Sequence, residues 1–424
     1  MINFKTNIEF ACGLDNLDEL RSFKKEFYIP KGEDGKSCIY LNGNSLGLQP
    51  KKTKEIIDQE LQDWARLGVR GHFESSTPWT DYHQLLTKKM AKIVGAKPIE
   101  TVIMNTLTVN LHFLMISFYN PTKKRNKILI ESDAFPSDRY AVESQIRLHG
   151  FDPKKCIIEW SPKKGEKLLK MDHLEEILEK NGGEIELLLI GGVNYYTGQY
   201  LNLKKIADLG HSKGCKVGID LAHGAGNIKP ELHKSGVDFA AWCTYKYLNS
   251  GPGNLGGVFV HERHAYNKSL KRLTGWWGQE KSNRFKMREP LHIIPGAEGW
   301  QVSNPPIISM ASIKASLDLF DMAGMDALRK KSVALTDYLE FLILNLDNNN
   351  IEIISPKKSD QRGCQLSILI KNSDKYLHKK LQKNNIITDW RDPGVIRCAP
   401  VPMYNSFEDI YNFSVILKTI LSKN

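Results

Sequence analysis

Short apolar runs alternate with longer amphipathic stretches through the middle of the chain. Five of these runs predict buried strands, over 128–130, 185–191, 215–221, 237–243 and 256–260. Residues 203–213 predict a helix between two of them, ended by Gly214. Because apolar runs separated by helices are typical of a sheet covered on both faces, we expect a mostly parallel α/β sheet.

The pattern changes after the paired prolines of SNPP. Residues 312–346 are strongly helical, with a break near Gly324. Four strand-like runs follow, IEIISP, QLSILI, IITDW and VIRCAPVP, with a helix over 375–383 among them and a last helix from Ser406. This mixture predicts a smaller α+β domain at the C-terminal end.

We therefore expect the chain to have three parts. Residues 1–60 form an N-terminal arm and helix that packs on the small domain, 61–309 form the large domain with the candidate site described below, and 310–424 form the small C-terminal domain. A length of 424 residues fits one large and one small domain.

The net charge changes this picture only slightly. A formal charge of +11 and a pI near 9.1 suggest a nucleic-acid partner. The basic residues are dispersed, however, and no zinc-finger or RNA-binding signature accompanies them. We therefore expect a solvated cationic surface and no nucleic-acid partner. A basic nucleic-acid-binding or scaffold protein is the alternative from another functional class.

The cysteines and the absence of long apolar runs indicate the compartment. Seven cysteines stand far apart and no CxxC motif occurs, which argues against a disulfide framework and a structural zinc, so no metal is expected. No run approaches the roughly 20 apolar residues of a membrane span, and the N-terminus lacks the apolar region of a signal peptide. We expect a cytoplasmic protein with no membrane partner.

A lysine and an acid follow two neighbouring strands. Lys246 stands in WCTYKYLNSGPG, just after the predicted strand 237–243, and Asp220 closes the preceding strand in GIDLAHGAGN. Since the carboxyl ends of parallel strands meet at one edge of a sheet, both side chains are expected there. The two residues fit a buried ion pair. They also fit pyridoxal 5′-phosphate, which needs a lysine for its aldehyde and an acid beside its pyridine nitrogen.

Two further motifs favour the cofactor. Thr108, in NTLTVN, precedes a helical run and would offer a hydroxyl and backbone N–H groups to a phosphate. FPSD, residues 135–138, follows an apolar strand and supplies the ring of Phe135 and the carboxylate of Asp138. Taken singly, Thr108 is more often a helix cap and Phe135 more often part of a core. Their occurrence together, in this order, favours a pyridoxal-phosphate site.

With these motifs the chain resembles the kynureninase family over nearly its whole length, from Tyr40 to Phe407. The resemblance rests on MNTLTVNLHFLM, FPSDRYA, VNYYTGQY, DLAHGAGN, WCTYKYLNSGPG, GWWGQ and SNPP. It implies the fold of fold-type I pyridoxal-phosphate enzymes, with a mostly parallel α/β large domain and a smaller α+β C-terminal domain. It also implies hydrolytic Cβ–Cγ cleavage of L-kynurenine or 3-hydroxy-L-kynurenine to an anthranilate and L-alanine, in tryptophan degradation or NAD biosynthesis.

The alternative within the same fold is a cysteine desulfurase or an aminotransferase. A desulfurase needs a mobile nucleophilic cysteine on an exposed loop. Cys364 stands at the edge of a predicted strand and is a poor candidate for that role.

The resemblance assigns the cofactor contacts residue by residue. It implies that Lys246 forms the Schiff base with the cofactor and moves the substrate's α-proton, and that Asp220 pairs with the pyridine nitrogen. Tyr245 reaches the phosphate and is a candidate proton donor to the leaving carbon. The other implied cofactor contacts are Leu107, Thr108, Phe135, Pro136, Ser137, Asp138, His223, Trp276 and Asn304. The last two are expected to reach the site from the partner subunit of a homodimer.

The substrate contacts also follow from the resemblance. Arg397 is expected to bind the α-carboxylate, a task that suits the fork of a guanidinium. Ser45, His72 and Asn304 match positions near the aryl ring, and their polar groups motivate the hypothesis that 3-hydroxykynurenine is at least as good a substrate as kynurenine. The alternative is that His72 and Asn304 only order a loop. One departure is a glycine, Gly191 or Gly192, where some members have serine, so a hydroxyl contact is not carried over there.

Overall fold

The main sheet of the protein has seven strands. The computed structural model describes residues 3–287, 290–373 and 375–422. The strand order is β2-β8-β7-β6-β5-β3-β4, and β8 is antiparallel to both of its neighbours while the other strands pair in parallel. The strands are β2 (Thr101–Met104), β3 (Lys127–Glu131), β4 (Ile157–Trp160), β5 (Ile185–Gly191), β6 (Lys216–Asp220), β7 (Phe239–Cys243) and β8 (Gly256–Val260). The predicted mostly parallel sheet is confirmed.

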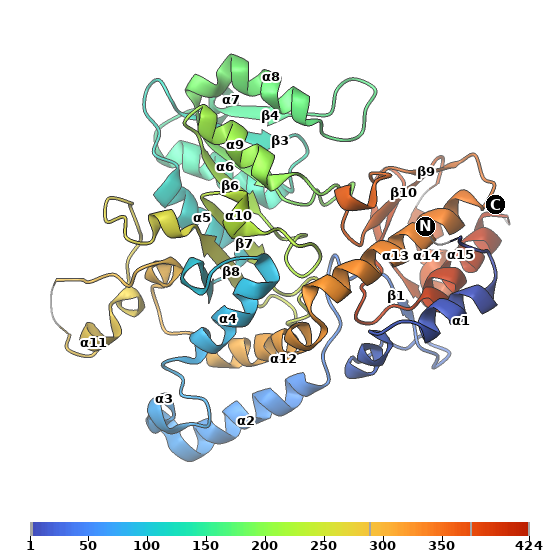
Figure 1. Cartoon of the computed structure of the whole chain (residues 1–424), viewed down its shortest axis with the longest axis horizontal. Coiled ribbons are helices and arrows are strands. Elements are labelled where there is room, and N and C mark those ends of the chain that lie inside the picture. The colour runs from blue at the N-terminus through green and yellow to red at the C-terminus, as the bar shows by residue number, and fades with distance from the viewer. Residues whose placement is uncertain (1–2, 288–289, 374, 423–424) are drawn as a thin grey trace.

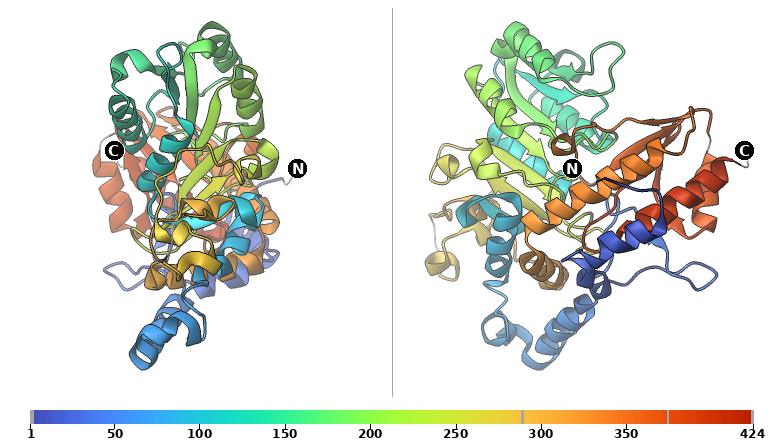
Figure 2. Two further views of the ribbon diagram at one scale, coloured as in Figure 1. Left: turned by 90° about the vertical axis from the view of Figure 1, so that its left-hand side faces the viewer. Right: turned by 45° about the vertical axis from the view of Figure 1, so that its right-hand side comes forward.

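Helices cover both faces of this sheet, as Figures 1 and 2 show. Along β5, Leu187 and Leu189 point into one core cluster, whereas Leu188 and Ile190 point into another. Both faces of the strand are therefore buried, which explains why its sequence is a continuous apolar run. The first cluster is completed by α5 (Leu107–Phe118) and α6 (Pro136–Leu148), the second by α8 (Met171–Asn181) and α9 (Leu203–Ser212).

A second, smaller sheet lies in the C-terminal part, with the order β12-β13-β10-β9 and antiparallel pairing throughout. Its strands are β9 (Ile351–Ile353), β10 (Leu366–Ile370), β12 (Asp389–Arg391) and β13 (Val395–Cys398). The helices α13 (Met325–Leu344), α14 (Lys375–Lys383) and α15 (Phe407–Leu421) accompany it. The predicted α+β region is confirmed, and it has a hydrophobic core of its own.

The two ends of the chain meet in this region. Helix α1 (Ile8–Asn16) packs on α15, and β1 (Ile39–Tyr40) pairs in parallel with β11 (Ile386–Ile387). The buried carboxylate of Asp15 accepts backbone N–H groups from Phe407 at 2.8 Å and from Glu408 at 2.9 Å, which satisfies donors at the start of α15. Figure 1 shows α1 beside α15.

One helical segment bridges the two regions. Helix α12 (Ile307–Ala323) packs against α2 (Lys52–Leu67) and α4 (Tyr82–Val94), and its apolar side chains join the core of the large sheet. Gly324, with φ of +71°, separates it from α13. We propose on this packing that the domain boundary expected at residue 310 lies nearer Gly324.

The remaining α-helices are short: α3 (Gly71–Glu74), α7 (Pro153–Cys156), α10 (Leu232–Ser235) and α11 (Lys281–Arg284). Within the described residues, no helix is both long enough and apolar enough to cross a membrane.

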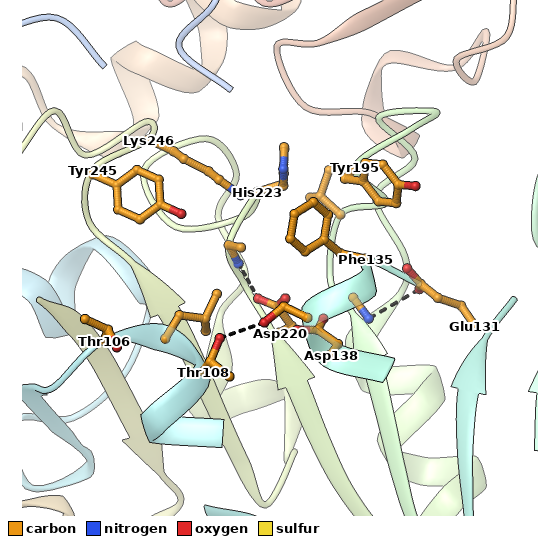
Figure 3. A pocket seen from close by; sticks show the side chains of 15 residues that line it. Thr106, Thr108, Glu131, Phe135, Asp138, Tyr195, Asp220, His223, Tyr245 and Lys246 are labelled. Atoms are coloured by element: carbon orange, nitrogen blue, oxygen red, sulfur yellow. Dashed lines mark hydrogen bonds between the residues drawn. The ribbon is translucent and has the colours of Figure 1, made fainter. Parts of the chain in front are cut away.

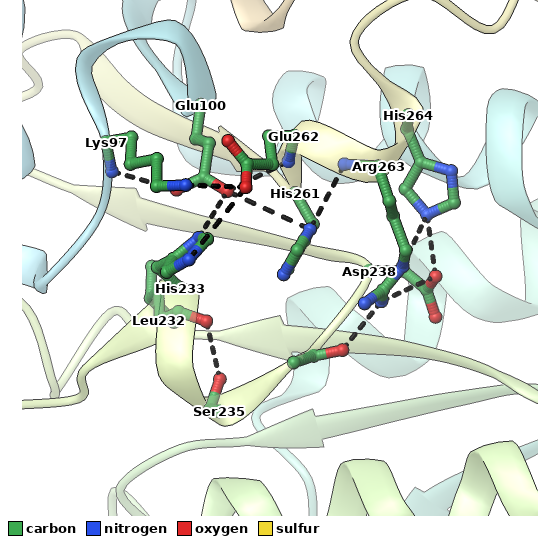
Figure 4. Close-up of polar contacts among 11 residues, drawn as sticks. Lys97, Glu100, Leu232, His233, Ser235, Asp238, His261, Glu262, Arg263 and His264 are labelled. Carbon is green, nitrogen blue, oxygen red and sulfur yellow. Dashed lines mark hydrogen bonds and ion pairs between the residues drawn. The ribbon is translucent and has the colours of Figure 1, made fainter.

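Buried carboxylates are paired with basic side chains at the edge of the large sheet where β7 begins (Figure 4). Asp238 accepts hydrogen bonds from His211 at 2.9 Å, His264 at 2.8 Å and Arg263 at 3.0 Å. Nearby, Glu100 accepts a hydrogen bond from His233 at 2.9 Å. These contacts join segments that are distant in the sequence.

Candidate active site

A cavity of about 190 Å³ opens at the carboxyl ends of β3, β5, β6 and β7 (Figure 3). Of the predicted site residues, the structure brings together in its wall Leu107, Thr108, Phe135, Ser137, Asp138, Asp220, His223, Tyr245 and Lys246. They come from segments that are up to 139 positions apart (246 − 107) and that meet because parallel strands end at the same edge.

Lys246 and Asp220 face this cavity without pairing with each other. The Lys246 Nζ lies 5.8 Å from the ring centroid of Phe135 and 6.0 Å from that of Tyr245. Among the described residues it has no ion-pair partner within 4.0 Å, so the alternative of a simple buried Asp220–Lys246 ion pair is not observed. The Asp220 carboxylate accepts the backbone N–H of Ala222 at 2.6 Å. The amine and the acid are therefore both available to a ligand.

Three carboxyl groups gather on the wall opposite Tyr245. Besides Asp220 these are Asp138, in the first turn of α6, and Glu131, the last residue of β3. Burial and the neighbouring charge of Asp220 raise the pKa of Asp138 well above its ordinary value. The same two causes raise the pKa of Glu131 to about 8. At neutral pH the cluster therefore keeps protons that isolated carboxyl groups would lose.

The part of the cavity at the start of α5 suits a phosphate. Helix α5 begins at Leu107, and its cap residue Thr106 makes no capping hydrogen bond through its side chain. The first N–H groups of a helix have no partners within the helix and carry partial positive charge. The hydroxyls of Thr108 and Ser137 lie 2.8 Å apart beside them, and Ser137 is in the first turn of α6. Two hydroxyls in hydrogen-bonding contact thus stand in the first turns of two helices at the cavity wall.

The pKa values of His223 and Tyr245 are shifted in opposite directions, and both side chains are left uncharged. Burial and the charges of Lys246 and Arg397 lower the pKa of His223 well below its ordinary value, so its ring is neutral. Its buried Nδ1 has no hydrogen-bond partner within the described residues. Burial raises the pKa of Tyr245, so its phenol keeps its proton and can donate it.

These groups fit pyridoxal 5′-phosphate. An amine without an ion-pair partner matches its aldehyde, and the Asp220 carboxylate matches its ring nitrogen. The hydroxyls and helix starts match its phosphate. Phe135, whose ring also meets Tyr195 edge-on at 5.4 Å, offers an apolar face to its ring. The orphaned Nδ1 of His223 is the kind of buried polar atom that a ligand would satisfy.

Arg397 lies behind this wall rather than in it. Its buried guanidinium donates to the backbone carbonyl of Tyr195 at 2.7 Å and pairs with Asp389. Its Nε has no hydrogen-bond partner within the described residues. Since Tyr195 lines the cavity, the guanidinium is one residue away from the space where a ligand would lie.

Five other predicted residues lie outside the cavity lining: Ser45, His72, Pro136, Trp276 and Asn304. Trp276 donates to the side chain of Asn304 at 3.0 Å, on an exposed part of the surface. The ring of His72 packs edge-on against Trp79 at 5.4 Å. Pro136 is the first residue of α6. In a single chain the predicted aryl-pocket residues are therefore not part of the wall that holds Lys246, although the backbone N–H of Gly47, two residues after Ser45, donates to the carbonyl of Tyr245 at 2.8 Å.

Six residues of the cavity wall were not among the predicted site residues: Thr106, Glu131, Gly191, Val193, Tyr195 and Ala222. Glu131 carried the same signal as Asp220, an acid that closes an apolar run. Thr106 precedes the helix start as a cap residue does. Tyr195 lies in the motif VNYYTGQY, but nothing in the sequence pattern alone says which of its two tyrosines faces the cavity.

Sequence comparisons identify relatives over nearly the full chain. A family model described as "Kynureninase C-terminal domain" matches residues 328–417. A protein named kynureninase from Myxococcus xanthus is 53% identical over 410 residues, which is 97% of this chain and 96% of that protein. Another from Rattus norvegicus is 46% identical over 436 aligned positions, covering 98% of this chain and 94% of its own.

Solved structures with the same fold are more distant in sequence. A cysteine desulfurase from Escherichia coli superposes with a TM-score of 0.76 at 16% identity, covering 96% of this chain and 99% of its own. One from Thermococcus onnurineus gives 0.74 at 16%, covering 91% and 95%. At this identity the likeness shows the fold alone. Cys364 is buried and burial raises its pKa to about 12, so a desulfurase is not favoured.

Proposed function

The chain belongs to the kynureninase family, and on that premise we propose that it hydrolyses the Cβ–Cγ bond of L-kynurenine and 3-hydroxy-L-kynurenine. The products are anthranilate or 3-hydroxyanthranilate, together with L-alanine, in tryptophan degradation or NAD biosynthesis. The observation that carries the proposal is one cavity with Lys246, Asp220 and Thr108 in its wall. The cofactor is pyridoxal 5′-phosphate.

The cofactor, when bound, supplies an aldehyde and an electron-accepting ring that stabilises negative charge on substrate carbon. We propose that Lys246 reaches the aldehyde and then carries the proton that leaves the α-carbon. Asp220 holds the proton of the ring nitrogen, and Phe135 packs on the ring. Thr108 and Ser137 bind the phosphate with the first N–H groups of α5, from Leu107 on.

Protonation of the leaving carbon is assigned to Tyr245. Burial raises the pKa of this phenol, so it enters the reaction with its proton in place. His223, neutral and without a partner for its Nδ1, is available as a hydrogen-bonding group toward the cofactor. Asp138 supports Asp220 as a neighbouring acid. Roles in the chain thus divide between proton carriers and groups that hold the cofactor.

Substrate orientation is assigned to Arg397. A guanidinium binds a carboxylate through two parallel hydrogen bonds, and the amino-acid end of kynurenine carries such a group. The position of Arg397 directly behind Tyr195 supports this assignment. Its bonds to Tyr195 and Asp389 fix the guanidinium before substrate arrives.

The aryl end of the pocket is proposed to form in a homodimer, where Trp276 and Asn304 of one subunit complete the site of the other. Their exposure on the single chain supports this. Leu61, Trp64, Val69 and Phe73 also expose large apolar surfaces on the projecting segment α2–α3. Mixing two inactive variants, Lys246→Ala and Trp276→Ala, should restore activity if sites are shared, and separate sites would leave the mixture inactive.

A cytoplasmic location is part of the same proposal. All seven cysteines are free thiols, as is usual in a reducing compartment.

The first experiment is a visible absorption spectrum of the purified protein, followed by the two substrates in parallel. We expect a yellow protein that releases alanine from both. A yellow protein that consumes neither would keep the cofactor but point to another reaction of this fold, and a protein that stays colourless with added cofactor would contradict the proposal.

The preference between the two substrates has its own test. If His72, Ser45 and Asn304 bind the ring hydroxyl, kcat/KM for 3-hydroxykynurenine equals or exceeds that for kynurenine, and His72→Phe lowers the ratio by about tenfold or more. A clear preference of the wild type for kynurenine would contradict the hypothesis.

A further inference from the structure

Glu131 lies in the cavity wall but has no part in the chemistry assigned above. It is buried at the end of β3, and among the described residues no lysine, arginine or histidine pairs with its carboxyl group. An unpaired buried acid is costly unless it is neutral or hydrogen-bonded. The question is therefore what stabilises the carboxyl group of Glu131 in the wall of the cavity.

Both oxygens of Glu131 accept hydrogen bonds from one segment. The backbone N–H of Gly191 donates to Oε2 at 3.3 Å, and the side-chain amide of Asn194 donates to Oε1 at 3.3 Å. Gly191 makes room for this contact, because a Cβ on that residue would lie only 2.9 Å from Oε1. The absence of a side chain at Gly191 thus admits the carboxyl group of Glu131.

Asn194 in turn organises the loop that follows β5. Its side-chain oxygen accepts the backbone N–H groups of Tyr196 at 3.0 Å and Thr197 at 2.9 Å, and the hydroxyl of Thr197 at 3.1 Å. An asparagine whose oxygen is used in this way can only present its amide N–H to Glu131. The acid therefore fixes the orientation of the side chain on which the turn depends.

The same turn holds Arg397. The backbone carbonyl of Tyr195 accepts the Arg397 guanidinium at 2.7 Å and the Gln365 amide at 3.0 Å. A continuous chain of hydrogen bonds and one short turn thus connects Glu131, beside Asp220, with the arginine of the small domain. A shift of the turn would shift that carbonyl, and with it the guanidinium.

We propose that Glu131 is a positioning residue: as a neutral acid it holds the Asn194 amide and the turn, and through the carbonyl of Tyr195 it orients Arg397 for the substrate carboxylate. The inference rests on the proposed function for the role of Arg397. The neutral state follows from burial beside two other carboxyl groups, Asp138 and Asp220, without a cation of its own. Burial and the charge of Asp220 also raise the pKa of Glu131 to about 8.

The decisive variant is Glu131→Ala. It leaves the N–H of Gly191 and the amide of Asn194 without their acceptor, so we expect KM for kynurenine to rise about tenfold while kcat stays within about threefold. In the cofactor-free protein, backbone hydrogen exchange over residues 192–199 should become faster. Asn194→Ala breaks the same link one residue further along and should raise KM in the same way.

Glu131→Gln tests the neutral state. The raised pKa of Glu131 means that the folded wild type keeps a proton that the unfolded chain releases above about pH 4.5. Relative to the Gln variant, cofactor-free wild type should therefore lose stability as the pH rises from about 4.5 to about 8, and the difference should then stay constant. Urea unfolding at pH 5 and pH 8 measures it.

Glu186→Gln is the matched control. This acid lies at the beginning of β5, the strand that ends at Gly191; it is paired with Arg125, and burial raises its pKa as well. It should change neither KM nor exchange over 192–199.

The proposal is overturned if Glu131→Ala behaves like this control. It is also overturned if Glu131→Gln lowers kcat more than about 100-fold at constant KM, which would make Glu131 a base in the chemistry. If the wild type cleaves neither substrate, the proposed function fails. Hydrogen exchange over residues 192–199 and urea unfolding still test whether Glu131 holds the turn.

Discussion

Carboxyl groups are buried at both ends of the parallel strands in the seven-stranded sheet, but only at one end are they paired with cationic side chains. At the edge where the parallel strands begin, Asp238 is surrounded by His211, His264 and Arg263. At the edge where they end, Asp138, Asp220 and Glu131 share a cavity whose Lys246 makes no ion pair with them among the described residues. The carboxyl groups are buried to a similar degree at both edges, so the difference lies in whether histidine or arginine side chains pair with them.

The pKa values follow this difference. Burial alone would raise the pKa of Asp238, but hydrogen bonds from His211 and His264 and the charge of Arg263 lower it below its ordinary value. At the other edge burial and the charge of Asp220 outweigh the hydrogen bonds to Glu131 and the charge of Lys246, and the pKa values of Asp138 and Glu131 rise. A carboxylate with cationic partners joins segments together, whereas a cluster of acids without an ion-pair partner is ready for a charged ligand.

The largest effect is expected from Lys246→Ala, which removes the amine at the edge that holds the cavity. Loss of the group that carries the α-proton should lower kcat by about 100- to 10,000-fold and abolish the visible band of the bound cofactor. Alanine release and the absorption spectrum measure both. Lys216→Ala, at the beginning of β6, is the control that should change neither.

Asp220→Asn tests whether the cluster is maintained for function at the cost of stability. The neutral amide cannot hold the proton of the ring nitrogen as a carboxylate does, so kcat should fall by about 100-fold or more. The cofactor-free protein should become more stable in urea, because one of three adjacent acids is removed. A loss of stability without loss of kcat would contradict the comparison.

Asp238→Asn should produce the reverse pattern. Breaking a buried, paired carboxylate should lower the free energy of unfolding by about 3 kcal/mol, while kcat per folded molecule stays unchanged. Since the fold lowers the pKa of Asp238 below its ordinary 3.8, the stabilisation is complete above about pH 4 and disappears as the pH falls further. Urea unfolding of wild type and variant between pH 3 and pH 7 should show the two curves converge at the acid end.

The smallest effect is expected at the phosphate end of the cavity. Thr108→Val removes a hydroxyl that lies 2.8 Å from that of Ser137, so the dissociation constant for pyridoxal phosphate should rise about tenfold. Fluorescence titration of the cofactor-free protein measures the constant. Thr122→Val, in a loop outside the cavity lining, should leave it unchanged.

The sequence predicted the sheet well because its signal is local. The runs 185–191 and 256–260 are strands with those same bounds, and Gly324 divides the long helical segment as expected. The strand expected from residue 237 begins only at Phe239, and the residue before it, Asp238, uses its side chain to bind the histidines. Asp220, Lys246 and Thr108 could be placed together because each follows or precedes a recognisable element.

Other parts of the site depend on strand order and on contacts between distant segments, which the pattern of apolar residues does not reveal. Glu131 and Asp220 come together only because β5 lies between β3 and β6, and strand order cannot be read from the apolar runs. The link from Asn194 to Arg397 joins two sheets through one carbonyl. Family resemblance alone suggests the roles of Ser45, His72, Trp276 and Asn304. These roles stay predictions, because the fold of a single chain does not show contacts between subunits.

The meeting of the two chain ends has a consequence for synthesis on the ribosome. Helix α1 is made long before the segment on which it packs, which begins at Phe407. The large sheet, whose strands all lie between Thr101 and Val260, can assemble during translation before α15 exists, whereas α1 must wait until α15 has been made. A chain that stops before residue 407 would thus leave the apolar side chains of Phe10, Ala11 and Leu14 without α15, a mark by which quality control can recognise it as incomplete.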